Sequence, residues 1–133
     1  VDARVPGGFD FLGYHFERGQ KWPRRKALDR FKDKVRERTP RSSGESMEAT
    51  IASLNDMLRG WFGYFKHSSR DRLDGLDSYI RGRLRSILRK RMGRRGRGRG
   101  YDHQRWRNHY FDELGLFSLT RAHVSARLSP QGV

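Results

Sequence analysis

An evenly spaced row of arginines is the feature of this sequence that most directly predicts chemistry. Arg81, Arg85 and Arg89 recur every four residues, which places them on one face of a helix. Like charges at this spacing repel one another, so the row destabilises the helix unless an anion lies against it. Guanidinium groups bind phosphate through paired N–H donors, and the row therefore predicts phosphate binding.

The basic charge of the chain is concentrated around this row. The 133 residues carry a formal net charge of +15, and residues 81–107 hold twelve Arg or Lys against one acid, Asp102. Such an excess predicts a polyanionic partner, with nucleic acid ahead of an anionic membrane. Residues 93–100 read GRRGRGRG, a low-complexity stretch that is expected to be disordered when free and to follow a phosphate backbone.

No constellation of catalytic or metal-binding residues is visible in the sequence. The five histidines are scattered without metal-ligand spacing, and no P-loop or dinucleotide fingerprint occurs. Asp71, Asp74 and Asp77 form a row on a predicted helix, where salt bridges to Arg70, Arg81 or their neighbours are expected. The absence of cysteine excludes a disulfide framework and a thiolate metal site. We therefore predict no metal, no cofactor and no catalytic activity of this chain by itself.

Membrane insertion is not expected. No apolar run approaches the roughly 20 residues that a helix needs to cross a bilayer, and no signal peptide is visible at the start of the sequence. We therefore predict a soluble protein and place it in the cytoplasm.

A helix over residues 47–66 must organise the other elements. Its apolar residues hold one helical face for about five turns, and Ser46 can cap its N-terminus. Gly60 and Gly63 interrupt the pattern, each at a cost of roughly 0.5–1 kcal/mol relative to alanine. This cost predicts the close approach of a nucleic-acid strand or of another backbone, and a crossing of two core helices is the favoured alternative.

The rest of the chain reads as short strands followed by helices. Residues 1–22 predict a short β-hairpin or a pair of strands, and Pro23 is expected to mark the start of the first helix. That helix is interpreted as a solvated amphipathic helix rather than as a binding face. Helices are predicted over residues 24–38, 69–92, 101–114 and 118–128. The expected fold is mainly α, a three-to-four-helix bundle preceded by a β-hairpin.

Three stretches together resemble the C-terminal part of group II intron-encoded reverse transcriptases. Residues 9–14, FDFLGY, are similar to the F-L-G-Y motif that closes the polymerase palm. Residues 54–65, LNDMLRGWFGYF, and residues 76–85, LDSYIRGRLR, are similar to two motifs of the maturase-specific domain, also called domain X or thumb. The chain has no Y-A-D-D motif, so the resemblance implies that it cannot copy RNA by itself, whereas the parent protein would be an RNA-directed DNA polymerase.

The resemblance implies a thumb-like bundle that binds intron RNA and the template-primer duplex to support splicing and reverse transcription. Residues 1–22 would then be the end of the palm, residues 23–115 domain X, and residues 116–133 a C-terminal extension. The remainder of the reverse transcriptase would be a partner, and DNA is left open as a second ligand.

The candidate site residues combine this resemblance with the charge pattern. The hairpin that is expected near the primer consists of Phe11, Leu12, Gly13 and Tyr14. The residues that are expected to contact RNA are all basic: Arg59, Lys66, Arg81, Arg83, Arg85, Arg89, Lys90, Arg91, Arg94, Arg95, Arg97 and Arg99.

Two other functions fit the same residues. A stand-alone basic scaffold of ribosomal type would bind RNA without a polymerase partner, and a preference for intron RNA over ribosomal RNA would argue against it. The thumb of a non-intron reverse transcriptase, such as one associated with a CRISPR system, would share the same motifs.

Overall fold

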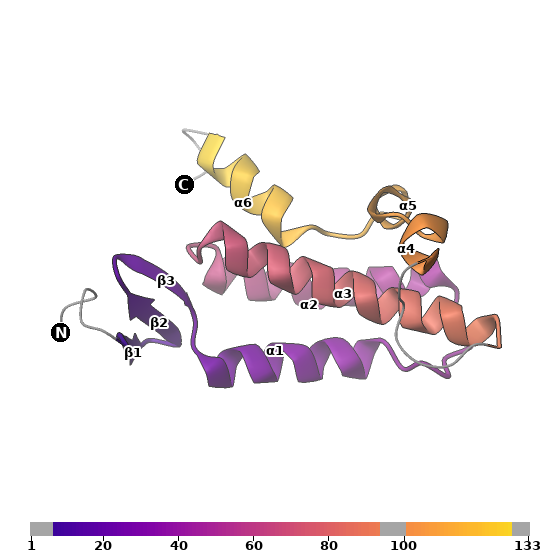
Figure 1. The fold of residues 1–133 in the computed structure, drawn as a ribbon, viewed down its shortest axis with the longest axis horizontal. Coiled ribbons are helices and arrows are strands. Elements are labelled where there is room, and N and C mark those ends of the chain that lie inside the picture. The colour runs from indigo at the N-terminus through magenta and orange to yellow at the C-terminus, as the bar shows by residue number, and fades with distance from the viewer. Residues whose placement is uncertain (1–6, 94–100, 129–133) are drawn as a thin grey trace.

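Three long helices form the body of the protein, and a small sheet precedes them (Figure 1). The computed structural model describes residues 7–93 and 101–128. In Figure 1, α2 and α3 lie between α1 and three shorter C-terminal helices. The long helices are α1 (Arg25–Arg38), α2 (Met47–Phe65) and α3 (Arg70–Arg91), and the short ones are α4 (Tyr101–Arg105), α5 (Asn108–Glu113) and α6 (Leu119–Leu128). The expected mainly α fold with a short β element before it is confirmed.

The sheet contains one strand more than the predicted hairpin. Its antiparallel strands, in spatial order, are β1 (Phe9–Phe11), β2 (Tyr14–Glu17) and β3 (Gln20–Pro23). Both connecting turns consist of two residues with positive φ, which are Leu12 (52°) with Gly13 (85°) and Arg18 (51°) with Gly19 (78°). Positive φ at both central positions is the type I′ pattern, whose twist matches that of the flanking strands.

Pro23 ends β3 instead of opening α1, so the expected helix start is wrong. Pro23 pairs with Tyr14 across the sheet, and Arg24 is the N-cap residue of α1 with an extended backbone. Proline is tolerated at the end of an edge strand because it has no ladder hydrogen bond to donate there. The N–H of Arg24 donates to the carbonyl of Gly13 at 2.8 Å, which fixes the entry of α1 beside the β1–β2 turn.

The hydrophobic core lies where the three long helices meet. Ser46 caps α2 as predicted, because its Oγ accepts a hydrogen bond from the N–H of Ala49 at 3.1 Å.

None of the described helices is both long and apolar enough to cross a bilayer. The buried core side chains of the long helices include Phe31, Val35, Ile51, Leu54, Leu58, Leu73, Ile80, Leu84 and Ile87.

Gly60 and Gly63 do not lie at a helix crossing. Both glycines are exposed, and a Cβ atom added at either would meet no atom of the described residues within 4 Å. The predicted close packing of two core helices at these positions is therefore wrong. The approach of a nucleic-acid strand to this open side of α2 stays a prediction.

Asn55 of α2 forms hydrogen bonds that hold the turn between α5 and α6 against the core. Its Nδ2 donates to the carbonyl of Gly115 and its Oδ1 accepts from the N–H of Phe117, both at 2.8 Å. The two bonds together hold a turn that would otherwise leave backbone groups unpaired. Beyond this turn, Leu116 and Leu119 are buried in the same core as the long helices.

Asp77 of α3 caps the N-terminus of α6, a helix that begins more than 40 residues further along the chain. Its carboxylate is only 4% exposed and accepts from the N–H groups of Leu119 (2.9 Å) and Thr120 (3.0 Å) and from the hydroxyl of Ser118 (3.1 Å). A carboxylate at a helix N-terminus satisfies otherwise unpaired N–H groups. The predicted salt bridge of Asp77 to an arginine is therefore replaced by this cap.

The helix expected over residues 101–114 is two helices, so that boundary prediction is wrong. α4 ends at Arg105 and α5 begins at Asn108. The carbonyl of Trp106, between them, accepts a hydrogen bond from Arg85 at 2.8 Å. This hydrogen bond from α3 lies at the break between the two helices, although the apolar residues of 101–114 are spaced as in one helix. The short helix expected near residues 118–128 is confirmed as α6.

His15 of β2 lies between two carboxylates. Its Nδ1 is 2.7 Å from Oδ1 of Asp10, and its Nε2 is 3.0 Å from Oε1 of Glu17. Hydrogen bonds to Glu17 and Asp10 raise the pKa of His15 above its usual value of 6.5. The imidazolium therefore stabilises the sheet fully below the unfolded pKa, and this contribution is lost as the pH rises through the raised pKa of the folded state.

We expect an NMR titration of the His15 ring protons to give a pKa above 6.5. Glu17→Gln should lower this pKa, because it removes the charged acceptor with the largest effect. Glu113→Gln, on α5, is the matched control and should leave the titration of His15 unchanged. A His15 pKa at or below the usual value would show that the two carboxylates do not hold its proton.

Candidate nucleic-acid interface

Arg85 is buried, so it does not lie on an exposed surface as the sequence predicted. It is 3% exposed, and its Nε and Nη2 donate to the carbonyl of Trp106 and to Oδ1 of Asn108, each at 2.8 Å. The guanidinium also lies 5.3 Å from the ring centroid of Phe111. Burial lowers the pKa of Arg85 below its ordinary value. Arg85 therefore joins α3 to the α4–α5 segment.

Arg89, one turn further along α3, is paired within the protein as well. Its Nη1 lies 2.7 Å from Oδ2 of Asp102, and the two side chains are 15% and 1% exposed. The anion that the arginine row requires is therefore supplied in part by Asp102, the single acid of residues 81–107. Arg81, the third member of the row, is half-buried and donates to Oγ of Ser78 at 3.3 Å.

We expect Arg85→Gln to lower the free energy of unfolding by about 1–3 kcal/mol, because the buried acceptors at Trp106 and Asn108 lose their donor. Arg81→Gln is the matched control on the same helix and should change stability by less than about 0.5 kcal/mol. Urea unfolding followed by circular dichroism measures both. Unchanged stability of Arg85→Gln together with weaker RNA binding would contradict the structural role.

The other predicted RNA contacts on α3 are also tied to neighbouring loops. Arg83 is half-buried and donates through Nη2 to the carbonyl of Thr39 at 2.7 Å and through Nε to its Oγ1 at 3.2 Å. Lys90 and Arg91 are exposed, and they reach Oγ of Ser42 and the loop that precedes α2. These three residues brace the loop between α1 and α2 while two of them stay open to solvent.

Two predicted contacts lie on α2 or at its end. Arg59 and Lys66 are both exposed, and the guanidinium of Arg59 lies 5.8 Å from the ring of Phe117. Neither lines the cleft that contains Arg83 of α3. The predicted contacts Arg94, Arg95, Arg97 and Arg99, with residues 94–100 of the glycine-arginine stretch as a whole, lie outside the described residues.

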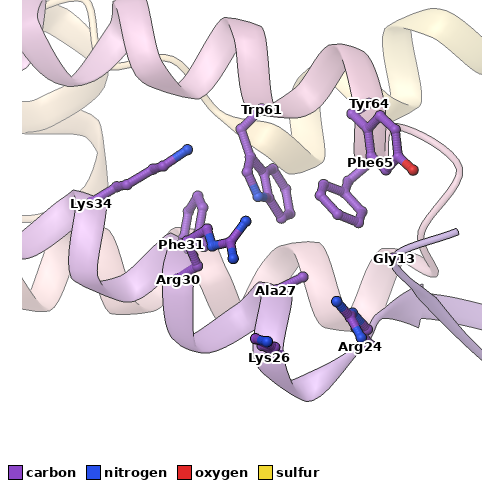
Figure 2. Close-up of a pocket in the computed structure, with 10 residues that line it drawn as sticks. All are labelled: Gly13, Arg24, Lys26, Ala27, Arg30, Phe31, Lys34, Trp61, Tyr64 and Phe65. Atoms are coloured by element: carbon purple, nitrogen blue, oxygen red, sulfur yellow. The ribbon is translucent and has the colours of Figure 1, made fainter. Parts of the chain in front are cut away.

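A cleft between α1 and α2, called here the α1–α2 cleft, gathers cations over an aromatic floor (Figure 2). Its volume is about 280 Å³, and no carboxylate lines it. In Figure 2, Trp61 and Phe65 point from α2 toward α1. The cleft is lined by Gly13, Arg24, Lys26, Ala27, Arg30, Phe31, Lys34, Trp61, Tyr64 and Phe65.

The floor of this cleft is a continuous series of ring contacts. The ring centroids of Phe31 and Trp61 are 4.5 Å apart, and those of Trp61 and Phe65 are 4.7 Å apart. Tyr64 meets Phe65 edge to face at 4.7 Å and is 55% exposed. Rings at these separations pack favourably, and an exposed ring at the end of the series can stack on a base.

The basic wall of the cleft comes from α1. Arg30 and Lys34 are exposed and lie four residues apart, so they share one face of the helix. The sequence prediction of a solvated helix did not assign them a binding role. The sequence did contain a signal for a binding face on this helix. Positions 27, 30, 31 and 34 share a helical face that carries no acid, whereas the acids of α1 fall at other positions.

Two tyrosines connect the sheet to the end of the cleft. The hydroxyl of Tyr14 donates to the carbonyl of Tyr64 at 2.7 Å, and the hydroxyl of Tyr64 donates to the carbonyl of Leu12 at 2.5 Å. Burial raises the pKa of Tyr14, which keeps its hydroxyl a donor. Gly13 lies between them with φ of 85°, and a Cβ there would come within 3.4 Å of the Tyr64 ring.

The four residues of the predicted primer-proximal hairpin therefore have different surroundings. Phe11 and Leu12 are 59% and 68% exposed, whereas Tyr14 is buried and Gly13 lines the α1–α2 cleft. The turn presents two apolar side chains to solvent beside the basic wall. Within the described residues no group of three or more histidines, cysteines and acids is arranged to hold a metal ion.

Residues 28–110 match the model of a protein family described as the group II intron, maturase-specific domain. The matched span includes most of α1 and all of α2 and α3, and it contains six of the ten residues that line the α1–α2 cleft, whereas Gly13, Arg24, Lys26 and Ala27 precede it. No protein with a curated description matches the chain.

Proposed function

The chain belongs to the family of the group II intron maturase-specific domain, so its function is related to group II intron splicing. We propose that it acts in this process by binding intron RNA. The single observation that carries this proposal is the α1–α2 cleft, in which four cations border an aromatic floor and no carboxylate intervenes. Cations attract the phosphate backbone, and exposed rings stack on bases. The parent protein would be an RNA-directed DNA polymerase, with the rest of the reverse transcriptase as a partner.

The main RNA contact then lies on α1 rather than on the arginine row of α3. Arg85 and Arg89 are paired within the protein, whereas Lys26, Arg30 and Lys34 are exposed beside the cleft. Arg59, Lys66, Lys90 and Arg91 are exposed and add to the basic surface that surrounds this contact. RNA is then captured through its backbone and shape rather than through a base-by-base code.

We further propose that the exposed tip at Phe11 and Leu12 contacts the template-primer duplex in the parent enzyme. The tip is held beside the α1–α2 cleft by the hydrogen bonds of Tyr14 and Tyr64. Apolar side chains can lie against the sugars and base edges of a minor groove, which is wide and shallow in A-form duplexes. The cleft and the tip would then follow one nucleic acid.

The salt dependence of binding to a group II intron RNA tests the proposed function. If about six phosphates are neutralised, the log-log plot of affinity against salt should have a slope of roughly −4 to −5. Fluorescence anisotropy with the 133-residue chain gives this slope, and ribosomal RNA is the matched competitor. A slope near zero would exclude backbone capture, and equal affinity for both RNAs would favour the ribosomal-type scaffold.

A further inference from the structure

A second basic cleft lies on the other flank of α1, between α1 and α3, and is called here the α1–α3 cleft. Its volume is about 580 Å³. From α1 it receives Lys32 and Arg36, which are each two positions beyond Arg30 and Lys34 of the first cleft. Two positions turn a helix by roughly 200°, so these pairs face opposite sides of α1. The two clefts therefore border different surfaces of the protein.

The cations of the α1–α3 cleft surround one aromatic ring. Nζ of Lys32 lies 5.4 Å and Cζ of Arg36 lies 5.9 Å from the ring centroid of Tyr79. Arg41 and Arg83 complete the basic lining, and none of the lining residues is a carboxylate. Arg36 also forms an exposed ion pair with Asp33 at 2.7 Å, so four cations face one nearby acid. The remaining positive charge in a partly enclosed space favours the binding of an anion.

Arg83 keeps donors available in this cleft. A guanidinium has five N–H donors, and the contacts of Arg83 to Thr39 use Nε and Nη2. Burial is the main cause that lowers the pKa of Arg83; Tyr79 opposes this effect, and the nearby charges of Arg36 and Arg41 add smaller lowering effects. An anion in the cleft would relieve this mutual repulsion of the cations.

Tyr79 supplies an independent sign of a missing partner. Its Oη is buried and has no hydrogen-bond partner within the part of the chain that the structure describes. Buried hydroxyls nearly always have a partner, because an unpaired one costs free energy. Gly82, one turn along α3, leaves the adjoining space open, since a Cβ there would meet no atom within 4 Å.

We propose that the α1–α3 cleft is a second phosphate-binding site that takes a backbone phosphate of RNA from the side of α1 opposite the α1–α2 cleft. Arg83, Arg36 and Lys32 supply the charge, and the Tyr79 hydroxyl, which is closed to solvent in the free protein, donates to a phosphate oxygen once the atoms that cover it move aside. This inference rests on the proposed function and adds a second contact to it. Two separate strands or RNA segments would then lie along the two flanks of one helix.

Paired variants of the 133-residue chain test the site with fluorescein-labelled group II intron RNA. We expect Lys32→Gln with Arg36→Gln to weaken binding about tenfold and to make the salt slope shallower by about two. Arg18→Gln with Arg127→Gln removes the same charge from exposed positions outside both clefts and should have a smaller effect. Equal losses in the two double variants would overturn the site, because only overall charge would then matter.

Tyr79→Phe tests the geometry without changing the charge. We expect about threefold weaker RNA binding at unchanged thermal stability, because only the unpaired hydroxyl is removed. Unchanged affinity of Tyr79→Phe would remove the hydroxyl from the site and overturn that part of the proposal. Inorganic phosphate is titrated in parallel by NMR, and saturation of the Gly82 amide shift by phosphate as tightly as by RNA would assign the cleft to a free anion instead.

The two sites can fail separately. If Arg30→Gln with Lys34→Gln weakens binding while Lys32→Gln with Arg36→Gln matches its control, the proposed function stands and the second site is rejected. If neither pair differs from the control, both proposals fail. When the two sites act independently, the losses of the two pairs should add on a logarithmic scale in the fourfold variant.

Discussion

Replacing Lys26, Arg30 and Lys34 by Gln should weaken the binding of group II intron RNA about a hundredfold at moderate salt. All three side chains are exposed on the α1–α2 cleft, so the folded state does not depend on them. Each lost phosphate contact should also make the salt slope shallower by about one, or about three for the triple variant. The loss of RNA affinity in the triple variant should therefore be larger at low salt than at high salt, because fewer counterions are released when fewer phosphates are neutralised.

The matched control removes three exposed cations from elsewhere, at Arg18, Arg70 and Arg127. This control lowers the net charge equally, so it measures the non-specific attraction of the protein for a polyanion. Circular dichroism and thermal unfolding should show both triple variants folded. If the cleft variant and the control bind RNA alike, the cleft is not the interface.

Asp77→Ala should lower the free energy of unfolding by about 3–4 kcal/mol, the largest stability effect that we expect from a single polar residue. The change leaves the buried N–H of Leu119 and the donors of Ser118 and Thr120 without their acceptor. Unsatisfied buried donors cost about 1–3 kcal/mol each, and α6 loses its cap as well. Denaturant unfolding at neutral pH measures the change.

Asp74→Ala is the control for this prediction. Asp74 is exposed and accepts one hydrogen bond, from the hydroxyl of Thr120 at 2.8 Å, so we expect a change below about 1 kcal/mol. Equal stability of the two variants would contradict the capping role of Asp77. Selective loss of RNA binding by Asp77→Ala, without destabilisation, would instead place the residue at the interface.

The long helices could be predicted because their apolar residues recur with helical spacing over several turns. Ser46 was likewise visible, since a cap is a local feature. The third strand was missed because β3 has only four residues and ends in proline, which reads equally well as a helix start. The break between α4 and α5 depends on Arg85, which lies more than twenty residues away in the sequence.

The arginine row shows where spacing alone is insufficient. Its positions on one helical face were predictable, but the partners that lie against that face were not, because Asp102 and Asn108 follow a stretch with no periodic pattern. The α1–α2 cleft depends on the tertiary placement of two helices. Only the acid-free face of α1 could have indicated it from the sequence.

The burial of Leu116 and Leu119 has a practical consequence for work with shortened versions of this protein. A chain ended at residue 115 would uncover the side of α2 and α3 that these leucines occupy. It would also remove the N–H of Phe117 from Asn55 and the N–H of Leu119 from Asp77. Such a truncation would be prone to aggregate through the bared apolar surface. Expression boundaries for binding assays therefore belong after Leu128.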